Sequence, residues 1–149
     1  KWRIDLERME RVVPLFIDRI SRRQGITVYG REKVLDFTYI DDCIAGICAG
    51  IERLLSGEVV NQTINLAYGE GNSLVCLAEL IGSALGVKPK INFAPSRLGE
   101  VTHYVADISK ARSILGYAPE VPLAEGVRRA VKWKRSWGRE RQMAWGGGG

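Results

Sequence analysis

The chain has 149 residues, of which 46% are hydrophobic and 26% are charged, so it suits one folded domain and is not a disordered chain. The formal net charge is +5, but the basic residues are dispersed. This pattern indicates solvated helix faces and argues against the basic face with exposed aromatics that nucleic-acid binding requires, while a small phosphate-bearing ligand remains compatible with it.

The cysteine and histidine content argues against a metal site. The three cysteines lack a CxxC spacing and His103 is the only histidine, so we expect reduced thiols and no metal. No signal-peptide pattern is recognised, and no apolar run reaches the roughly 18 residues of a membrane span. We therefore expect a cytoplasmic protein with no membrane segment and no nucleic-acid partner.

The N-terminal part of the chain predicts a charged entry segment, a short helix and a short strand. Residues 1–13 are expected to form a surface segment, and the folded domain is expected over residues 14–140. Pro14 suits the first turn of a helix, and Gly25 ends it. Residues 26–29 then alternate as a strand does.

The central segment predicts a strand that leads directly into a helix. Residues 34–40 are rich in β-branched and aromatic side chains, which favours a strand. Between residues 44 and 55 the apolar spacing predicts a helix with one buried face, within which Gly46 and Gly50 allow close approach to a sheet. Asp41 or Asp42 is expected to cap this helix. Capping and loop anchoring explain these carboxylates better than a metal or acid–base site.

The C-terminal part continues the alternation of strands and helices. The predicted elements are a strand over residues 59–67, a helix between Ser73 and Gly86, a strand over residues 90–94, a helix between Asp107 and Gly116, and a last helix from Leu123 to about Trp137. Residues 141–149 are expected to form a flexible, glycine-rich tail. The alternation predicts the α/β class with a small sheet.

The segment Leu35–Asp42, LDFTYIDD, resembles the RDFxYVDD segment of the NAD-dependent nucleotide-sugar epimerases and dehydratases, which are extended short-chain dehydrogenases. Further segments match the same family in the same order: residues 8–17 its helix entry, residues 25–30 a strand with flanking glycines, residues 64–67 its YNLG strand, residues 95–100 its PxRxGE motif, and residues 106–119 its ADxSKA and LGYxP motifs. The resemblance, to UDP-glucose 4-epimerase-like members, implies an α/β fold with a small mixed sheet and about five helices.

The resemblance is to the C-terminal, substrate-binding portion of these Rossmann-type enzymes, and the N-terminal dinucleotide-binding half is missing. The sequence has no strand–GxxGxxG–helix fingerprint. Tyr29 and Lys33 have the spacing of the family's Tyr-x-x-x-Lys pair, but they lie across a predicted turn rather than on one helix face, so we reject them as catalytic residues. We expect no catalytic and no cofactor-binding residues here, because NAD belongs to the full-length family.

The resemblance implies a substrate-binding role for four residues. The arginine that matches Arg97 contacts the diphosphate of the nucleotide sugar, and the acidic residue that matches Glu100 accepts hydrogen bonds from ribose hydroxyls. Thr27 and Tyr29 match positions that line the base pocket. Plainer alternatives stay open, namely an exposed loop arginine, a solvated loop carboxylate and a half-buried strand aromatic.

One position departs from the family pattern. The family often has an arginine just before the aspartate that matches Asp36, and this arginine reaches the same diphosphate. Leu35 stands there in this chain, so the resemblance predicts weaker phosphate binding. Arg31 or Lys33, in the adjacent turn, is a candidate substitute.

Two functions remain open from the sequence. The first is a truncated nucleotide-sugar epimerase or dehydratase that retains weak nucleotide-sugar binding without redox catalysis. The second is a non-catalytic, self-associating interaction module. The apolar helix face around Ile44 and Ile51 and the strand at residues 64–66 pack in the family on the missing sheet, so we expect a homodimer or a domain-swapped oligomer to cover them.

Overall fold

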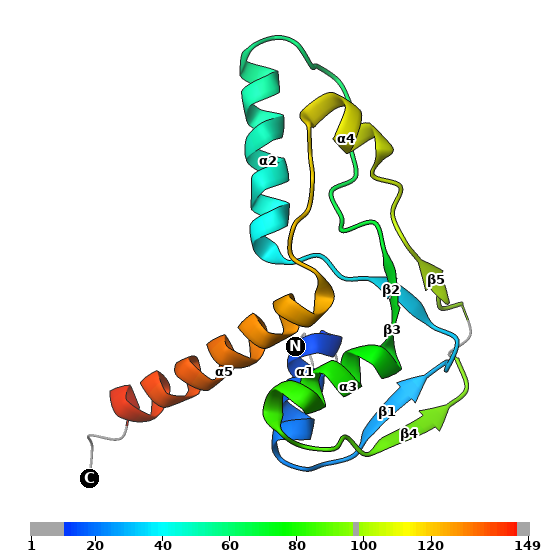
Figure 1. Ribbon diagram of the computed structural model, residues 1–149, viewed down its shortest axis with the longest axis vertical. Helices are drawn as coiled ribbons and strands as arrows, with labels where there is room; N and C mark the ends of the chain where they lie inside the picture. The colour runs from blue at the N-terminus through cyan, green and yellow to red at the C-terminus, as the bar shows by residue number, and fades with distance from the viewer. Residues whose placement is uncertain (1–10, 97–98, 146–149) are drawn as a thin grey trace, which may run out of the picture.

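A computed structural model describes residues 11–96 and 99–145 of the chain. The described part contains five helices and five strands: α1 Val12–Ser21, β1 Ile26–Tyr29, β2 Val34–Asp36, α2 Ile40–Leu55, β3 Gly71–Ser73, α3 Leu74–Leu85, β4 Ile91–Ala94, β5 His103–Tyr104, α4 Ser109–Leu115 and α5 Leu123–Trp145. These elements confirm the predicted α/β class with a small mixed sheet. Helix α5 continues beyond its predicted end near Trp137, and its later turns extend away from the other elements (Figure 1).

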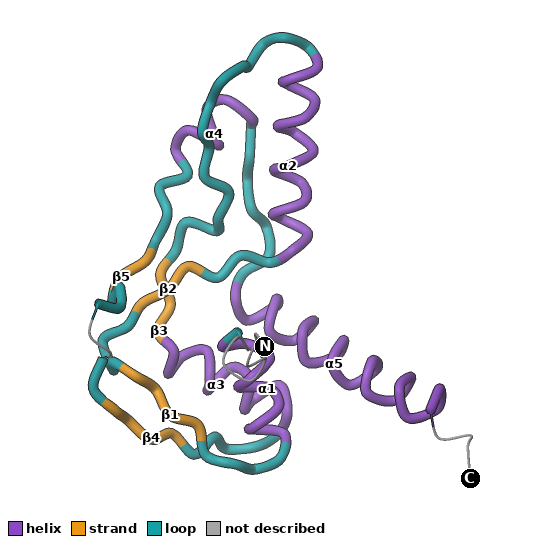
Figure 2. Tube along the Cα trace, turned by 180° about the vertical axis from the view of Figure 1, so that it is seen from behind, coloured by secondary structure: helices purple, strands orange, loops and turns teal. Residues whose placement is uncertain are grey.

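The strands form two small sheets rather than one. In the first, β1 and β4 are parallel, with Thr27 opposite Asn92 and Tyr29 opposite Ala94. In the second, the order is β3-β2-β5, where β2 is antiparallel to β3 and parallel to β5. The second sheet lies between the two ends of the molecule, with β1, β4, α1 and α3 at one end and α2 and α4 at the other (Figure 2).

The main core lies among α1, β1, α3 and α5. Its buried side chains are Phe16, Ile17, Ile20, Ile26, Val28, Leu74, Leu77, Ala78, Ile81, Val127 and Val131. Helix α3 has the ends that the sequence predicts: the Ser73 hydroxyl accepts from the Cys76 amide at 3.0 Å, and Gly86 has a φ of +69°. The alternating burial of β1 points Ile26 and Val28 into this core and leaves Thr27 and Tyr29 exposed.

A second, smaller cluster fixes α2 and α4 beside the segment around Leu66. It is built on Ala67, Ile108, Ala111, Leu115 and Tyr117. A β-carbon at Gly46 of α2 would lie 2.6 Å from the Leu66 side chain and 3.0 Å from the Tyr117 ring. The predicted close approach is therefore confirmed at Gly46, but to side chains of a loop and of the segment after α4 and not to a sheet. At Gly50 the prediction was wrong, because a β-carbon there would meet no atom within 4 Å.

The predictions for two strands were wrong in extent. Residues 59–67 form no strand, since they pair with no described strand. The Thr63 carbonyl instead accepts a hydrogen bond from the Lys110 ammonium, and the Asn65 side chain donates one to the Asp107 carbonyl. The strand predicted over residues 34–40 ends at Asp36. The segment that pairs with it is β3, which is not among the predicted strands. A strand is defined by its partner, which a local pattern does not identify.

The predicted buried face of α2 is instead exposed. Of its sixteen residues only Asp42 and Gly46 are buried. We name as the α2 stripe its six large apolar side chains, which are 49–82% exposed: Ile40, Ile44, Ile47, Ile51, Leu54 and Leu55. The periodicity correctly predicted a helix, but the surface that such a face needs is not among the described residues.

Candidate functional site

Two of the four residues predicted to bind substrate, Tyr29 and Glu100, lie at one end of the β1–β4 pair or just beyond it, and Thr27 lies two residues before Tyr29 on β1. Thr27 and Tyr29 are on the exposed side of β1. Because β4 is parallel to β1, the segment that follows β4 starts beside the segment that follows β1, and the Gly30 amide donates to the Ala94 carbonyl at 2.9 Å. Glu100 belongs to this second segment. Arg97 lies outside the described residues, so its place in the site stays a prediction.

The turn after β1 is linked to the segment after β4 by side chains. The Ser96 hydroxyl donates to Glu32 Oε1 at 2.6 Å, and Lys33 Nζ lies 2.6 Å from Glu100 Oε2. The hydrogen bond from Ser96 holds the pKa of Glu32 below its usual value. Gly30, with a φ of +76°, is required at this contact because a β-carbon there would overlap the Ser96 hydroxyl.

The two candidate substitutes for the missing arginine already have partners. The Arg31 guanidinium stacks 4.9 Å from the centre of the Phe93 ring, and Lys33 is paired with Glu100. Leu35 itself packs half-buried against the main core. The sequence suggested Lys33 as a phosphate contact, but it did not indicate the pairing with Glu100, because no local pattern joins residues so distant in the chain.

Two acidic residues at the centre of the chain are structural anchors. Asp36 accepts hydrogen bonds from the Tyr68, Gly69 and Ala106 amides at 3.0–3.3 Å, which confirms the predicted loop anchoring. Neither Asp41 nor Asp42 caps α2, because Tyr39 occupies the cap position and no side chain bonds there.

Asp42 instead holds the segment before α5. Its two carboxylate oxygens accept from the Glu120 amide at 2.9 Å and from the Val121 amide at 3.0 Å. In the part of the chain that the structure describes, no group of His, Cys, Asp or Glu residues is arranged to hold a metal ion.

The described residues do not fit a dinucleotide. A pyrophosphate site of this kind needs a glycine-rich turn from a strand into a helix. The only described strand that leads directly into a helix is β3, where α3 begins at Leu74 immediately after the capping Ser73.

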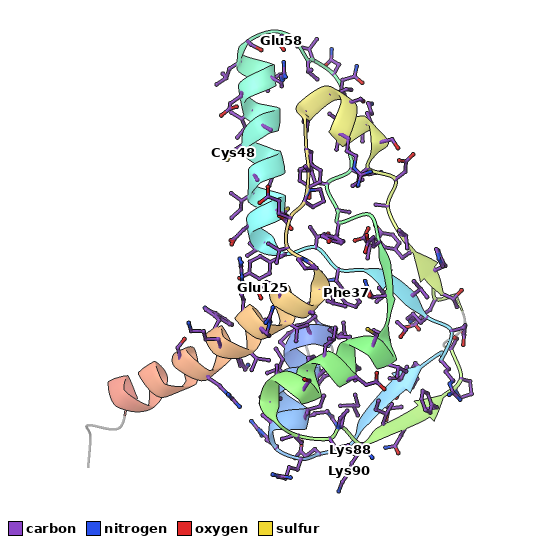
Figure 3. The ribbon with its side chains drawn as sticks, in the orientation of Figure 1. Phe37, Cys48, Glu58, Lys88, Lys90 and Glu125 are labelled. Atoms are coloured by element: carbon purple, nitrogen blue, oxygen red, sulfur yellow. The ribbon has the colours of Figure 1, made fainter. Side chains whose placement is uncertain are left out.

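A separate groove of about 470 Å³ lies between the start of α1, residues 36–39 and the start of α5. Its lining is mostly apolar and includes Val12, Phe37, Val121 and Val127. Figure 3 shows Phe37 and Glu125 in this region. Thr27, Tyr29 and Glu100 do not line this groove, so its volume does not define the predicted substrate site. Among the described residues, no helix has both the length and the apolar character to cross a membrane.

Comparison with known proteins agrees with the fold and the motifs. The sequence model of a family of nucleotide-sugar enzymes, described as GDP-mannose 4,6 dehydratase, matches residues 3–130. The chain belongs to this family. It is similar to a putative UDP-glucose 4-epimerase of Methanocaldococcus jannaschii, with 30% identity over 126 residues that cover 84% of this chain and 39% of that protein. It is also 32% identical over 122 residues to the UDP-glucuronate 4-epimerase of Thermodesulfobacterium geofontis, covering 80% of this chain and 36% of that protein.

Solved structures of nucleotide-sugar epimerases have a fold similar to that of this chain. The UDP-glucuronic acid 4-epimerase of Bacillus cereus, in complex with UDP-glucuronic acid and NAD, has a TM-score of 0.79 and 29% identity over 86% of this chain and 40% of that chain. The UDP-glucose 4-epimerase of Thermotoga maritima with UDP-glucose has a TM-score of 0.76 and 28% identity over 85% of this chain and 40% of that chain. The chain thus spans well under half the length of the relatives named here.

Proposed function

We propose that this chain binds a nucleotide sugar and is the substrate-binding part of an NAD-dependent epimerase or dehydratase. The observation that carries this proposal is that residues predicted to bind substrate from two distant parts of the chain lie near one end of the β1–β4 pair. Thr27 and Tyr29 present their side chains on the exposed side of β1, and the segment that contains Glu100 is tied to the turn directly after it. The relatives that crystallised with UDP-glucose or UDP-glucuronic acid support this ligand class.

In this proposal the chain has no redox catalysis of its own. Hydride transfer needs a bound nicotinamide and an acid–base group beside it. The sequence contains no GxxGxxG fingerprint, and the Tyr29–Lys33 spacing spans the end of β1 and the turn after it, with Lys33 paired to Glu100. The NAD named in the relatives' complexes therefore belongs, in this proposal, to a different part of the enzyme.

The test is a titration of the purified chain with UDP-glucose and with GDP-mannose, followed by calorimetry or NMR. We expect one of the two to bind with a Kd in the range of roughly micromolar to millimolar. Arg97→Ala should weaken binding by about tenfold, because a guanidinium makes two charge-assisted hydrogen bonds to a diphosphate.

A matched control is Lys88→Ala. Lys88 lies at the opposite end of the β1–β4 pair, in the loop before β4 (Figure 3). Its replacement by alanine removes one positive charge, as Arg97→Ala does, and should leave the Kd unchanged. If neither nucleotide sugar binds at millimolar concentration, or if both variants weaken binding equally, substrate binding at this site is contradicted.

The α2 stripe favours a second candidate function, a self-associating module. Six large apolar side chains on a helix of sixteen residues, about 24 Å long, form a continuous exposed surface of the kind that proteins bury against a partner. In this candidate a second copy covers the stripe, as a homodimer or a domain-swapped oligomer.

Light scattering of the purified chain tests this second candidate. We expect a dimer or larger assembly that Ile47→Glu dissociates, because the glutamate places a charge at the middle of the stripe. Glu52→Lys, a charge change at an exposed residue of the same helix outside the stripe, is the control and should leave the assembly intact. A wild-type chain that stays monomeric at high concentration contradicts self-association.

A further inference from the structure

Basic side chains that are distant in the sequence come together around the loop between α3 and β4, which lies at the opposite end of the β1–β4 pair from the proposed nucleotide site. Two neighbouring hollows lie there, of about 110 Å³ and about 420 Å³, and Val87 lines both of them. We name as the basic rim the cations that line these hollows: Arg23, Lys88, Lys90, Lys134 and Arg135. Figure 3 shows Lys88 and Lys90 at the end of the molecule away from α2.

The basic rim has no counter-charge. Among the described residues none of its members forms an ion pair, and no described residue that lines either hollow is an aspartate or a glutamate. The neighbouring Arg22, by contrast, is paired with Asp18 at 3.0 Å. Like charges that face one space repel each other, so the unliganded chain carries an electrostatic cost that a bound anion removes. The charge of this surface therefore favours a ligand with several negative groups.

Arg23 holds its place in the rim at a conformational cost. It has a φ of +57°, and the Gln24 amide donates to the Arg19 carbonyl at 2.8 Å, as in the turn that closes many helices with a glycine. Helices α3 and α4 do end on a glycine in this left-handed region, Gly86 and Gly116. Glycine adopts such a backbone freely, whereas a residue with a β-carbon is strained there. An arginine at this position indicates that its side chain is used, since strain of this kind persists at functional sites.

The floor of the two hollows is apolar and recessed. Its side chains are buried or half-buried, and they include Ile17, Ile20, Leu85 and Val87. A recessed floor does not project into a bilayer as the apolar face of a membrane-surface helix does. No described aromatic side chain lines the hollows, so a nucleic-acid base finds none to stack on. A peptide that carries an apolar side chain between acidic residues, in contrast, matches both the floor and the rim.

We propose that the basic rim and its apolar floor bind an acidic peptide segment of a partner protein. An apolar side chain of that segment occupies the larger hollow, and its carboxylates pair with the cations of the rim. The volume of about 420 Å³ lies within the range of roughly 300–1,000 Å³ that is usual for ligand pockets. This surface is separate from the proposed nucleotide site, and the inference does not depend on that proposal.

The experiment measures fluorescence anisotropy of a labelled peptide, Glu-Glu-Leu-Glu-Glu-Leu-Glu-Glu, titrated with the purified chain at low ionic strength. We expect a Kd in the micromolar range that rises as salt is added, because salt screens exposed charges. The same peptide with serine in place of both leucines should bind about tenfold more weakly, because it places no apolar surface on the floor.

The variant Arg23→Gly separates a loss of binding from a loss of folding. It removes one charge of the rim and also relieves the backbone strain at that position, so it should raise the Tm of the chain while it weakens peptide binding by about fivefold. Arg135→Ala should weaken binding to a similar extent. The charge-matched control is Arg112→Ala, an exposed arginine on α4 at the other end of the molecule (Figure 2), which should leave the Kd unchanged.

Several results would overturn the inference. Absence of peptide binding at millimolar concentration, or equal weakening by Arg23→Gly and Arg112→Ala, would show that the rim is not a peptide site. Equal affinity for the leucine and serine peptides would show that the floor takes no part. If labelled oligothymidylate or vesicles that contain phosphatidylserine bind more tightly than the peptide, and Arg23→Gly weakens that binding, the partner is a nucleic acid or a membrane and not an acidic peptide.

Discussion

Asp42 gives the sharpest stability prediction, because its neighbour Asp41 is a built-in control. Asp42 is 6% exposed, and each of its carboxylate oxygens accepts one backbone amide, from Glu120 and from Val121. Asp41 carries the same group one position earlier, with a side chain that is 64% exposed and lies 3.5 Å from Arg129. The sequence treats the two aspartates alike, whereas the structure assigns them very different roles.

The substitution Asp42→Asn keeps the shape of the side chain and removes one acceptor. One of the two backbone amides then faces an NH₂ group and loses its partner in a buried place. A hydrogen bond to a charged group contributes about 1.5–3 kcal/mol, and an unsatisfied buried donor costs about 1–3 kcal/mol, so we expect a loss of about 3 kcal/mol in the free energy of unfolding. For a chain of this size that loss lowers Tm by about 10 °C.

The measurement is urea unfolding of the wild type, Asp42→Asn and Asp41→Asn, followed by circular dichroism. Asp41→Asn removes only an exposed ion pair and should cost less than about 1 kcal/mol. The difference between the two variants, rather than either value alone, tests the assignment. Equal losses for the two aspartates, or a loss below 1 kcal/mol for Asp42→Asn, would refute the reasoning.

Four further predictions concern the second cluster and the β1–β4 end. Tyr117 is 5% exposed and, among the described residues, its hydroxyl has no hydrogen-bond partner, so Tyr117→Phe should stabilise the chain by about 1 kcal/mol, whereas a loss of stability in thermal unfolding would reveal a partner. Burial, and then nearby charges, raise the pKa of Tyr117 above its ordinary 10.0. Above pH 10 the folded state therefore keeps a proton that the unfolded state releases, so the stability of the wild type should fall as the pH rises. The stability of Tyr117→Phe should fall less over the same pH range. Gly46→Ala should destabilise by about 1–3 kcal/mol in urea, because its β-carbon would lie 2.6 Å from Leu66; a neutral effect would show that Leu66 moves aside. Ser96→Ala should raise the pKa of Glu32 toward its ordinary value in an NMR titration, and an unchanged pKa would show that the Ser96 hydroxyl does not bind it in solution.

Local signals in the sequence predicted the elements whose causes are local. Ser73 caps α3 and Gly86 ends it, as expected from the preference of a hydroxyl for orphan amides and of glycine for positive φ. The strands at residues 26–29 and 91–94 also form within a residue of their predicted limits. What the sequence did not predict is that these two strands pair in parallel, since the pairing partner is a property of the whole chain.

Non-local contacts account for most of the differences between prediction and structure. Residues 59–67 have strand composition but no described partner strand, so they form none. Asp42 was predicted to cap α2, but it lies inside the first turn of that helix, and its carboxylate accepts from two amides of the segment before α5. The pairing of Lys33 with Glu100 similarly depends on the close approach of two distant segments. The motif resemblance pointed to Glu100 and Tyr29 as neighbours of one site, which physical patterning alone did not do.

The two ends of the molecule are held by different kinds of interaction. The end with the proposed nucleotide site rests on a main core whose side chains are buried among α1, β1, α3 and α5. Helix α2 contributes no large apolar side chain to either core, and it is held by the Asp42 hydrogen bonds and by close packing at Gly46. Its apolar residues face outward, so any surface that covers the α2 stripe would add hydrophobic stabilisation where the chain has least. We therefore expect the proposed self-association through the stripe and the proposed nucleotide binding to be separable, so that substitutions in one region leave the other to be measured independently.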